Sequence, residues 1–407
     1  MGISVGLVGL GQFGRSFADL FKAHPAVDRI ALCDGEPDRV RVYAEKEWWR
    51  DKFHPRDAYA SLDEICKSDL DALVIITQPW LHAPQCIQAL ESGKHVYSAV
   101  PVMCVPDSDE ILDWCDKLVR TCRRTGMHYM LGETTYYHSE AMYCRRRAAE
   151  GAFGDFVYSE GEYMHPYDGG CDLREVQRLR QASRAGRDWP ARVKEYQQRG
   201  LLTGPMHYPT HSVSGPMCVM KAHALKVCAW GFRPRARDPY FDDSAFSNET
   251  ALFQMTNGST MRICEFREIG GKGGEVFRVY GTMGSFEHNT WRPKTGAAVR
   301  LSAEEMRDPL PKDVAEAFRK AAGRDDFYGG HGGSHAYLTH EFVDAIASGR
   351  RPAIHVWEAV RYMAAGATAH KSALKDGEVL PVPDWGDGTE GSVSVQSWST
   401  TPPPTPP

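Results

Sequence analysis

The first 34 residues constrain the fold more than any other segment of the chain. Residues 3–8 form a short apolar run with β-branched members, which is typical of a buried parallel strand. This run leads directly into Gly9-Leu10-Gly11-Gln12-Phe13-Gly14 and a helical pattern, and a second apolar run ends in Asp34, 20 positions beyond Gly14. A strand, a glycine turn, a helix, a second strand and an acid in this order are the fingerprint of a dinucleotide site. The sequence therefore predicts a Rossmann-type unit at its start.

The residues of the glycine turn suit a phosphate-bearing cofactor. Gly9 allows the tight turn, Gly11 lets the backbone approach a pyrophosphate, and Gly14 lets the helix pack closely on the strand. Gln12 and Phe13 begin the helix, whose N-terminus offers free N–H groups to a phosphate. We therefore expect these five residues to bind the dinucleotide.

Asp34 indicates which dinucleotide is bound. A carboxylate at the end of the second strand accepts hydrogen bonds from the adenosine ribose hydroxyls and repels a 2′-phosphate. Residues 35–38 add further negative charge before the first basic residue, Arg39. NAD is therefore favoured over NADP, with an ordinary capping role for Asp34 as the competing interpretation.

Length and composition narrow the class of protein. The 407 residues suffice for two domains, and 42% hydrophobic and 25% charged residues are ordinary for a globular chain. A net charge of −5 disfavours a nucleic-acid binder, and no apolar run approaches the roughly 18 to 20 residues of a membrane span. The start lacks a signal-peptide pattern, and the eleven cysteines form no CxxC pair. We expect a cytoplasmic enzyme with no nucleic-acid or membrane partner.

Two histidine pairs have the spacing of metal ligands, His207/His211 and His331/His335. On a helix, either pair would point two imidazoles at one ion. Neither carries the glutamate of an HExxH motif, no third ligand is evident, and the second pair lies in a glycine-rich stretch without a helical pattern. We expect no metal.

The order of the expected elements predicts an α/β fold with two sheets. The first third alternates strands and helices, as in a doubly wound parallel sheet. From about Phe153 the sequence pattern changes to segments in which apolar and polar residues alternate. Such segments suit a large, mainly antiparallel sheet with one covered face. These segments span residues 156–164, 250–257, 260–267 and 275–280.

This pattern predicts four parts of the chain. They are an NAD-binding Rossmann domain over residues 1–132, an α/β substrate domain over 133–352, a helix and strand over 353–386 that return to the first domain, and a disordered tail over 387–407. The open face of the second sheet is the expected surface for a homo-oligomer. Within the second domain, residues 174–199 carry eight basic and three acidic residues and look like an insertion or lid. They either attract an anionic substrate group or form a solvated helical face.

Several short motifs occur together in an order that resembles one enzyme family. They are the glycine turn, Thr77-Gln78-Pro79-Trp80-Leu81-His82, residues 89–96, Ala99-Val100-Pro101 and the closing Val379-Leu380-Pro381. Together they resemble the glucose–fructose oxidoreductase / inositol dehydrogenase (Gfo/Idh/MocA) family over nearly the whole chain. The resemblance implies an NAD(P) cofactor and a sugar or polyol substrate. It also implies that Thr77, Pro79, Trp80, His82, Ala99 and Val100 lie at the cofactor.

The sequence departs from this family at one informative position. Most members carry Glu-Lys-Pro where this chain has Ala99-Val100-Pro101. In the family that lysine assists hydride transfer by polarising the reacting hydroxyl or relaying its proton. Val100 can neither ionise nor donate, so a base must come from elsewhere.

A second set of motifs is similar to the NAD-dependent glycosidases of the same superfamily, typified by the α-N-acetylgalactosaminidases. These enzymes also replace the lysine by valine. Matching motif to motif, the residues that fall where those enzymes line the sugar pocket are Glu133, Tyr163, His165, Tyr208 and His211. The glycosidases keep a glutamate at the position of Ala99, and this chain has its Arg-rich segment before Tyr208, so the particular sugar does not carry over.

The spacing of the Tyr and His residues suits acid–base chemistry. Tyr163 and His165 are two apart on an expected strand, and Tyr208 and His211 are three apart at a helix start, so each pair shares a face. An imidazole with a pKa near 6.5 is a suitable base for the hydroxyl that loses a hydride. We assign that role to His211 and a later proton abstraction to Tyr208. Aromatic packing around a satisfied histidine is the alternative for either pair, and a helix cap is the alternative for Glu133.

Three functions fit these observations. The first is a glycoside hydrolase that oxidises a ring hydroxyl transiently with NAD, eliminates the aglycone, adds water and returns the hydride. The second is a net NAD-dependent sugar or polyol dehydrogenase. The third is an inactive NAD-binding sensor, which the Tyr and His residues argue against.

Overall fold

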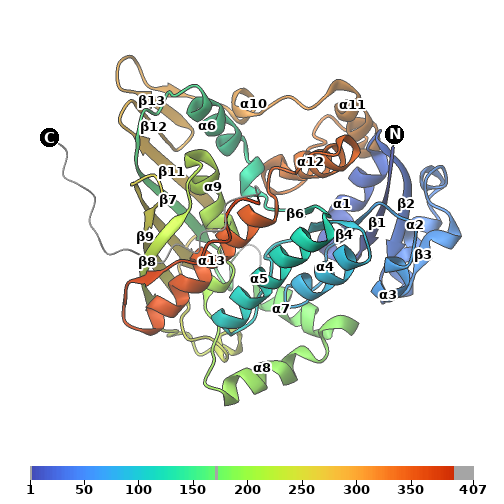
Figure 1. Cartoon of the computed structure of the whole chain (residues 1–407), viewed down its shortest axis with the longest axis horizontal. Helices are drawn as coiled ribbons and strands as arrows, with labels where there is room; N and C mark the ends of the chain where they lie inside the picture. Colours follow the sequence, from blue (N-terminus) through green and yellow to red (C-terminus); the bar gives the residue numbers. More distant parts are fainter. Residues whose placement is uncertain (1, 170–172, 389–407) are drawn as a thin grey trace.

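The computed structural model describes residues 2–169 and 173–388 (Figure 1). The parallel sheet predicted for the first third is confirmed. Its strands run in the order β3-β2-β1-β4-β5-β6, and every pairing is parallel. Their bounds are β1 Ile3–Val8, β2 Val27–Cys33, β3 Ala58–Tyr59, β4 Ala72–Ile75, β5 His95–Ser98 and β6 Tyr129–Leu131.

Helices flank this sheet where the sequence supplies apolar faces and caps. The longest, α5, begins after Asp107, whose carboxylate accepts from the backbone N–H groups of Asp109 and Glu110, and it ends at left-handed Gly126. The helices of this region are α1 Gln12–Ala23, α2 Pro37–Ala44, α3 Leu62–Cys66, α4 His82–Glu91 and α5 Ser108–Thr125. Shortly after α2 ends at Ala44, the chain forms the 3-10 turn η1 Glu47–Trp49.

The second sheet is larger than the sequence predicted. It runs in the order β14-β13-β12-β11-β7-β10-β9-β8-β15, with β7 and β10 parallel and the other pairings antiparallel. The strands are β7 Phe156–Met164, β8 Ala224–Phe232, β9 Asn248–Met255, β10 Thr260–Phe266, β11 Gly274–Gly281, β12 Gly284–Glu287, β13 Thr290–Pro293, β14 Val299–Arg300 and β15 Leu380–Pro381. The mainly antiparallel assignment holds.

One helix joins the two sheets. α13 (Val356–Leu374) packs against α5 of the first region and against β8 of the second sheet, and Figure 1 shows it crossing between them. The segment predicted to return to the first domain therefore does so only through its helix. Its strand β15 pairs with β8, because Leu380 and Pro381 lie opposite Val227 and Lys226.

The remaining helices lie around these two sheets. α9 (Thr210–Met220) covers β7 and β11, and all its side chains are buried or nearly so. The others are α6 Ser139–Ala149, α7 Leu173–Ala182, α8 Trp189–Gln198, α10 Ala303–Met306, α11 Lys312–Ala322 and α12 Ser334–Ser348. In the described part of the chain, no helix has the length and apolar character needed to cross a bilayer. The predicted tail lies outside the described residues from position 389 onward.

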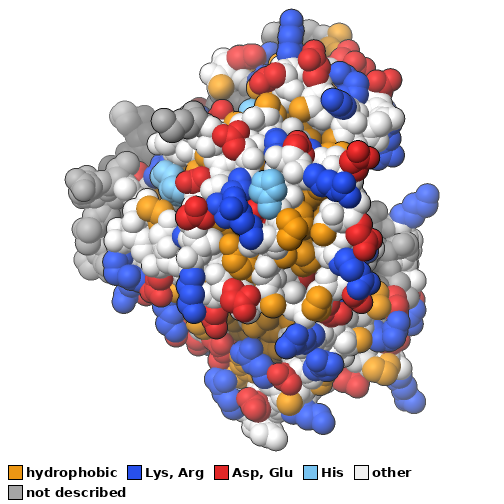
Figure 2. Space-filling model, turned by 90° about the vertical axis from the view of Figure 1, so that its right-hand side faces the viewer, with side chains coloured by type: hydrophobic (Ala, Val, Ile, Leu, Met, Phe, Trp, Pro, Cys, Tyr) orange, Lys and Arg blue, Asp and Glu red, His pale blue; other side chains and the backbone are white. Residues whose placement is uncertain are grey.

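The face on the side of the parallel sheet carries charges of both signs (Figure 2). Lys and Arg side chains alternate there with Asp and Glu around a group of hydrophobic side chains near the middle. Ion pairs link such residues on this sheet; Arg29 of β2, for example, bonds to both Asp57 and Asp69. This face therefore has a mixed electrostatic character.

Candidate functional site

The glycine turn has the geometry that a pyrophosphate requires. Gly9 has φ +93°, and a Cβ there would lie 2.1 Å from the Ile76 carbonyl oxygen. A Cβ on Gly14 would lie 2.0 Å from the carbonyl oxygen of Gly9, whereas one on Gly11 would meet no atom within 4 Å. Gly11 is also the N-cap of α1 and provides no side-chain cap. The first turn of α1 thus faces open space, which fits a bound phosphate.

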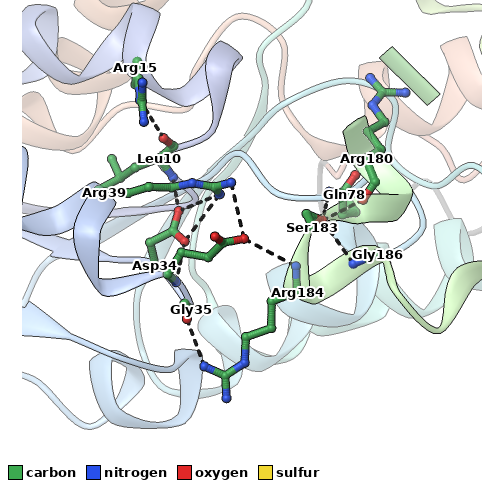
Figure 3. Close-up of polar contacts among 11 residues, drawn as sticks. Leu10, Arg15, Asp34, Gly35, Arg39, Gln78, Arg180, Ser183, Arg184 and Gly186 are labelled. Carbon is green, nitrogen blue, oxygen red and sulfur yellow. Dashed lines mark hydrogen bonds and ion pairs between the residues drawn. The ribbon is translucent and has the colours of Figure 1, made fainter. Parts of the chain in front are cut away.

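Asp34 closes this site at the end of β2. Its Oδ2 accepts from the backbone N–H of Leu10 at 2.7 Å, and its Oδ1 accepts from that of Glu36 at 2.8 Å (Figure 3). The guanidinium of Arg39 lies 3.4 Å from Oδ2. The carboxylate is therefore fixed beside the glycine turn, where the adenosine ribose of a dinucleotide is held in this fold.

The residues after β4, which were expected to contact the cofactor, also make close contacts within the protein. Thr77 donates to the side chain of Gln85 at 2.5 Å, and Trp80 stacks on Trp189 with ring centroids 4.3 Å apart and planes 8° apart. His82 begins α4, and its Nδ1 lies 2.8 Å from the Pro101 carbonyl oxygen. Burial lowers the pKa of His82 to about 4, so this imidazole is neutral. Contact of these residues with the nicotinamide stays a prediction.

The segment that replaces the family's Glu-Lys-Pro motif lies beside the candidate catalytic residues. Ala99 and Val100 are buried. The hydroxyl of Tyr208 donates to the carbonyl oxygen of Val100 at 3.1 Å. Pro79 lies on the same side, because its carbonyl oxygen accepts from the N–H of Cys104. The valine side chain thus lies next to a tyrosine that is anchored by the valine's own backbone.

His211 and Glu133 form a buried pair that joins the two sheets. Glu133 follows β6, and His211 lies in the first turn of α9. The Nδ1 of His211 lies 3.0 Å from Oε1 of Glu133, which also accepts from the Thr135 N–H at 2.9 Å. Glu133 therefore caps the following turn and orients the imidazole at once. Because a carboxylate only accepts, Nδ1 carries the proton, and Nε2 is the nitrogen that can act as a base.

The charges of this pair are strongly coupled. Burial disfavours a charged His211, but the carboxylates of Glu133 and Glu275 outweigh it and raise the pKa of His211 to about 9. Burial would likewise raise the pKa of Glu133, but the neighbouring His211 lowers it to about 2. The pair is therefore an imidazolium–carboxylate ion pair at neutral pH.

Both predicted Tyr/His pairs meet around His211. The ring centroid of Tyr163 lies 4.9 Å from that of His211, and that of Tyr208 lies 5.6 Å away. The hydroxyl of Tyr163 forms a hydrogen bond with Nδ1 of His165. The structure thus brings together the five residues that the resemblance assigned to the sugar pocket.

Sequence reasoning missed a set of charged residues next to these side chains. The guanidinium of Arg267 lies 4.9 Å from the centre of the Tyr163 ring and 2.8 Å from Glu265, which is fully buried. Glu275 of β11 accepts from Thr135 at 2.8 Å and lies 3.7 Å from His138. Strand register brings these residues together, since Glu265 and Glu275 both lie opposite Tyr163. The sequence signal that could have revealed them is the presence of charged residues within otherwise apolar strands.

The two histidine pairs considered as metal ligands do not converge on an ion. His207 bonds to Ser108 and packs against His370, with ring planes 53° apart, whereas His211 bonds to Glu133. His331 and His335 bond to each other at 3.0 Å, and His335 lies in α12, which corrects the expected absence of helix there. Residues 2–169 and 173–388 contain no cluster of three residues suited to a metal.

Comparison with known proteins agrees with this geometry. Residues 3–133 match the family model GFO_IDH_MocA, described as an oxidoreductase family with an NAD-binding Rossmann fold. Over 95% of its length the chain is 25% identical to a glycosyl hydrolase family 109 protein of Solibacter usitatus, covering 89% of that protein. It is 27% identical over the same share to a glycosyl hydrolase family 109 protein of Streptomyces filamentosus, covering 78% of it.

Solved structures share the fold. A levoglucosan dehydrogenase in complex with NADH and levoglucosan superposes with a TM-score of 0.70 at 17% identity, covering 94% of this chain and all of that one. Scyllo-inositol dehydrogenase from Lactobacillus casei superposes with a TM-score of 0.64 at 16% identity, covering 94% of this chain and 99% of that one. The match of residues 3–133 identifies the N-terminal region as an NAD-binding Rossmann domain of the Gfo/Idh/MocA oxidoreductase type.

Proposed function

We propose that the protein is an NAD-dependent glycoside hydrolase that oxidises a ring hydroxyl of its sugar transiently. The observation that carries this proposal is the buried His211–Glu133 pair, with Tyr163 and Tyr208 beside it, in a chain whose Val100 cannot act as the family's lysine. Such a set supplies more than one proton-transferring group, which an elimination requires and a simple oxidation does not. The similarity to glycosyl hydrolase family 109 proteins supports the proposal.

The first proton transfer belongs to His211. Bound NAD would accept a hydride from a ring carbon and return it at the end of the cycle. His211 removes the hydroxyl proton through Nε2, because its Nδ1–H is held by Glu133. Glu133 then stabilises the imidazolium, as a buried carboxylate does for a catalytic histidine. The hydroxyl carbon becomes a ketone.

The second proton transfer takes place next to that ketone. The ketone acidifies the neighbouring C–H, and loss of that proton expels the aglycone from the adjacent anomeric carbon. Tyr163 is a candidate for this step beside Tyr208, to which the sequence assigned it. Burial holds the pKa of Tyr163 well above its usual value against the opposing charge of Arg267, so its hydroxyl proton must pass to His165, with which it forms a hydrogen bond, before the oxygen acts as a base. Tyr208, already donating to Val100, is placed to hold a substrate oxygen or to serve as the alternative base. Water then adds to the enone, the α-carbon regains a proton, and the ketone is reduced.

A net NAD-dependent sugar or polyol dehydrogenase is the second candidate. His211 alone suffices for that reaction, and the solved structures with this fold include dehydrogenases of inositol and levoglucosan. The two candidates differ in whether the hydride returns to the substrate.

One experiment separates them. The enzyme is incubated with NAD and a panel of nitrophenyl glycosides in D2O, and nitrophenol, absorbance at 340 nm and deuterium incorporation are followed. Aglycone release without accumulation of NADH, with deuterium on the carbon next to the oxidised position, supports the hydrolase. Stoichiometric NADH supports the dehydrogenase instead. If a broad panel of sugars gives neither aglycone release nor NADH, both enzymatic functions are contradicted and an NAD-binding sensor remains.

We further propose that the protein is a cytoplasmic homo-oligomer that associates through the open face of the second sheet. Large apolar side chains are exposed on that face, namely Trp230, Phe232, Leu252 and Val276. They flank a network in which Glu160 and Glu162 pair with Arg262 and Arg278. A neutralised centre with apolar flanks suits an isologous contact with a second copy. The ten cysteines of the described residues are all free, which supports a reducing compartment.

A further inference from the structure

The Arg-rich segment of residues 173–199, here called the strap, lies against the cofactor domain. We propose that the strap forms the outer wall of the adenosine subsite and keeps NAD bound through successive turnovers. The inference that the cofactor is retained deepens the proposed hydrolase function, in which NAD is regenerated in place. The residues that carry it are Ser183 and Arg184.

Arg184 contacts the loop that follows the ribose-binding carboxylate. Its guanidinium donates to the carbonyl oxygen of Gly35 at 2.9 Å, and its backbone N–H donates to Glu36 at 3.3 Å (Figure 3). Glu36 also pairs with Arg39, which contacts Asp34. The strap is therefore connected through one short polar chain to the carboxylate that selects NAD.

Ser183 contacts the opposite side of the same site. Its hydroxyl accepts from the side chain of Gln78 at 3.0 Å, and Gln78 follows β4. The same hydroxyl donates to the Arg180 carbonyl oxygen at 2.6 Å and accepts from the Gly186 N–H at 3.1 Å. These bonds fix the turn η4 (Arg184–Gly186), so Ser183 and Arg184 act as one rigid unit.

The C-terminal half of the strap is held to the cofactor domain independently. Trp189 stacks on Trp80, and the hydroxyl of Tyr196 donates to Glu110 at 2.7 Å. Arg199 then pairs with Asp107 at 2.9 Å. With one end fixed in this way, the turn around Arg184 is the part that can open without unfolding the segment.

These contacts lie across the path by which the cofactor would leave. A dinucleotide in this fold lies across the carboxyl ends of β1, β2 and β4. Arg184 contacts Gly35 in the loop after β2, and Ser183 contacts Gln78 in the segment after β4, so the strap bridges the two sides of that crevice. NAD must therefore break both contacts to leave. The positive charge of Arg184 additionally favours the anionic cofactor.

Retention of the cofactor suits a redox-neutral cycle. An enzyme that returns the hydride to its own substrate needs no exchange of NADH for NAD. A net dehydrogenase must release NADH after every turnover, and a closed strap would slow it. The strap thus distinguishes the two candidate functions by a property of the cofactor site alone.

The test measures cofactor exchange without any sugar. The wild-type enzyme is loaded with etheno-NAD, passed through a desalting column and mixed with excess NAD, and the fluorescence change on release gives the dissociation rate. We expect slow release from the wild type and a roughly tenfold faster release from Arg184→Ala, which corresponds to about 1.4 kcal/mol of lost contact. Ser183→Ala should act in the same direction, since it removes the bond to Gln78.

The matched control is Arg187→Ala. Arg187 lies in the same strap, is exposed, and has no hydrogen bond or ion pair with the rest of residues 2–169 and 173–388. Its substitution removes one positive charge and should leave the release rate unchanged. Equal rates for wild type and Arg184→Ala, or an equal acceleration by Arg187→Ala, would overturn the proposal. The release assay contains no substrate, so its outcome does not depend on the reaction. Slow release of NAD here, together with stoichiometric NADH in the glycoside assay, would contradict the hydrolase function but not the role of the strap.

Discussion

His211 carries a proton that it must release before it can act as a base. With a pKa of about 9, it is mostly protonated at pH 7, and only its neutral fraction can accept the hydroxyl proton. This fraction grows as the pH rises toward 9. The negative charge that raises the pKa also fixes the imidazole, so orientation and proton affinity come from the same carboxylate.

The dependence of the rate on pH follows from this pair. We expect kcat/KM for the wild type to rise with pH up to about 9. Glu133→Gln keeps an acceptor for Nδ1 but removes the negative charge, so burial lowers the pKa of His211 with less opposition. The rising limb of the plot of kcat/KM against pH should therefore move to lower pH. Glu275→Gln should move it in the same direction by less. A limb that stays in place in Glu133→Gln would mean that another group limits the rate.

Removal of the imidazole tests the identity of the base. His211→Ala should lower the rates of both hydride transfer and product formation by roughly 10²- to 10⁴-fold while NAD remains bound. The measurement is single-turnover absorbance at 340 nm, with NAD binding followed by quenching of tryptophan fluorescence. Val100→Lys in the same background should restore part of the simple oxidation if the lysine reaches the hydroxyl. Near wild-type turnover of His211→Ala would exclude it as the base.

Asp34 is the residue that we propose sets the preference for NAD over NADP. Asp34→Ala should weaken NAD binding by roughly 1.5 to 3 kcal/mol and narrow the gap to NADP, because hydrogen bonds to a charged acceptor are lost. Titration calorimetry with both cofactors measures the change. Asp113→Ala is the control, since Asp113 is an exposed carboxylate on α5, away from the end of β2. An unchanged ratio of the two affinities would contradict the assignment.

At the scale of elements, the contact between α9 and β7 positions His211, the proposed base. A Cβ on Gly161 of β7 would lie 1.8 Å from the carbonyl oxygen of Ser212, which is backbone of α9 and cannot move alone. Gly161→Ala should therefore displace the helix, lower the free energy of unfolding by about 1 to 3 kcal/mol and reduce turnover. Urea denaturation and the glycoside assay measure both. Gly274→Ala in the neighbouring strand has no atom within 4 Å of the new Cβ and should change neither.

The elements that the sequence predicted best are those with a local signal. The glycine turn, β1 at residues 3–8 and β7 at residues 156–164 were predicted with their observed bounds, because apolar runs, alternation and turn residues mark them directly. The strands β12 to β14 were missed because each is only two to four residues long, too short for alternation to show. β8 was missed because its pairing with β9 and β15 depends on distant partners. The same reason hid Glu265, Arg267 and Glu275, which reach the site only through strand register.

At the scale of the whole molecule, the open sheet face is the surface to test for self-association. Trp230 is 54% exposed there, and Leu252 lies on the neighbouring strand with 46% exposure. We expect the wild type to sediment as a dimer or a larger closed oligomer, and Trp230→Glu to shift it toward the monomer. Val42→Glu on α2 is the control, because Val42 is equally exposed but lies in the first region. Identical sedimentation of wild type and Trp230→Glu would contradict this interface.

The ion pair between Glu133 and His211 has a consequence for motion. One partner follows the last strand of the parallel sheet, and the other lies on a helix of the second sheet, so the pair crosses from one half of the molecule to the other. Separation of the halves would remove the main charge that keeps His211 protonated. A displacement that separates the sheets would therefore release a proton from His211, and return to the closed form would take one up. A pH indicator in weak buffer would register the opening and closing of this enzyme.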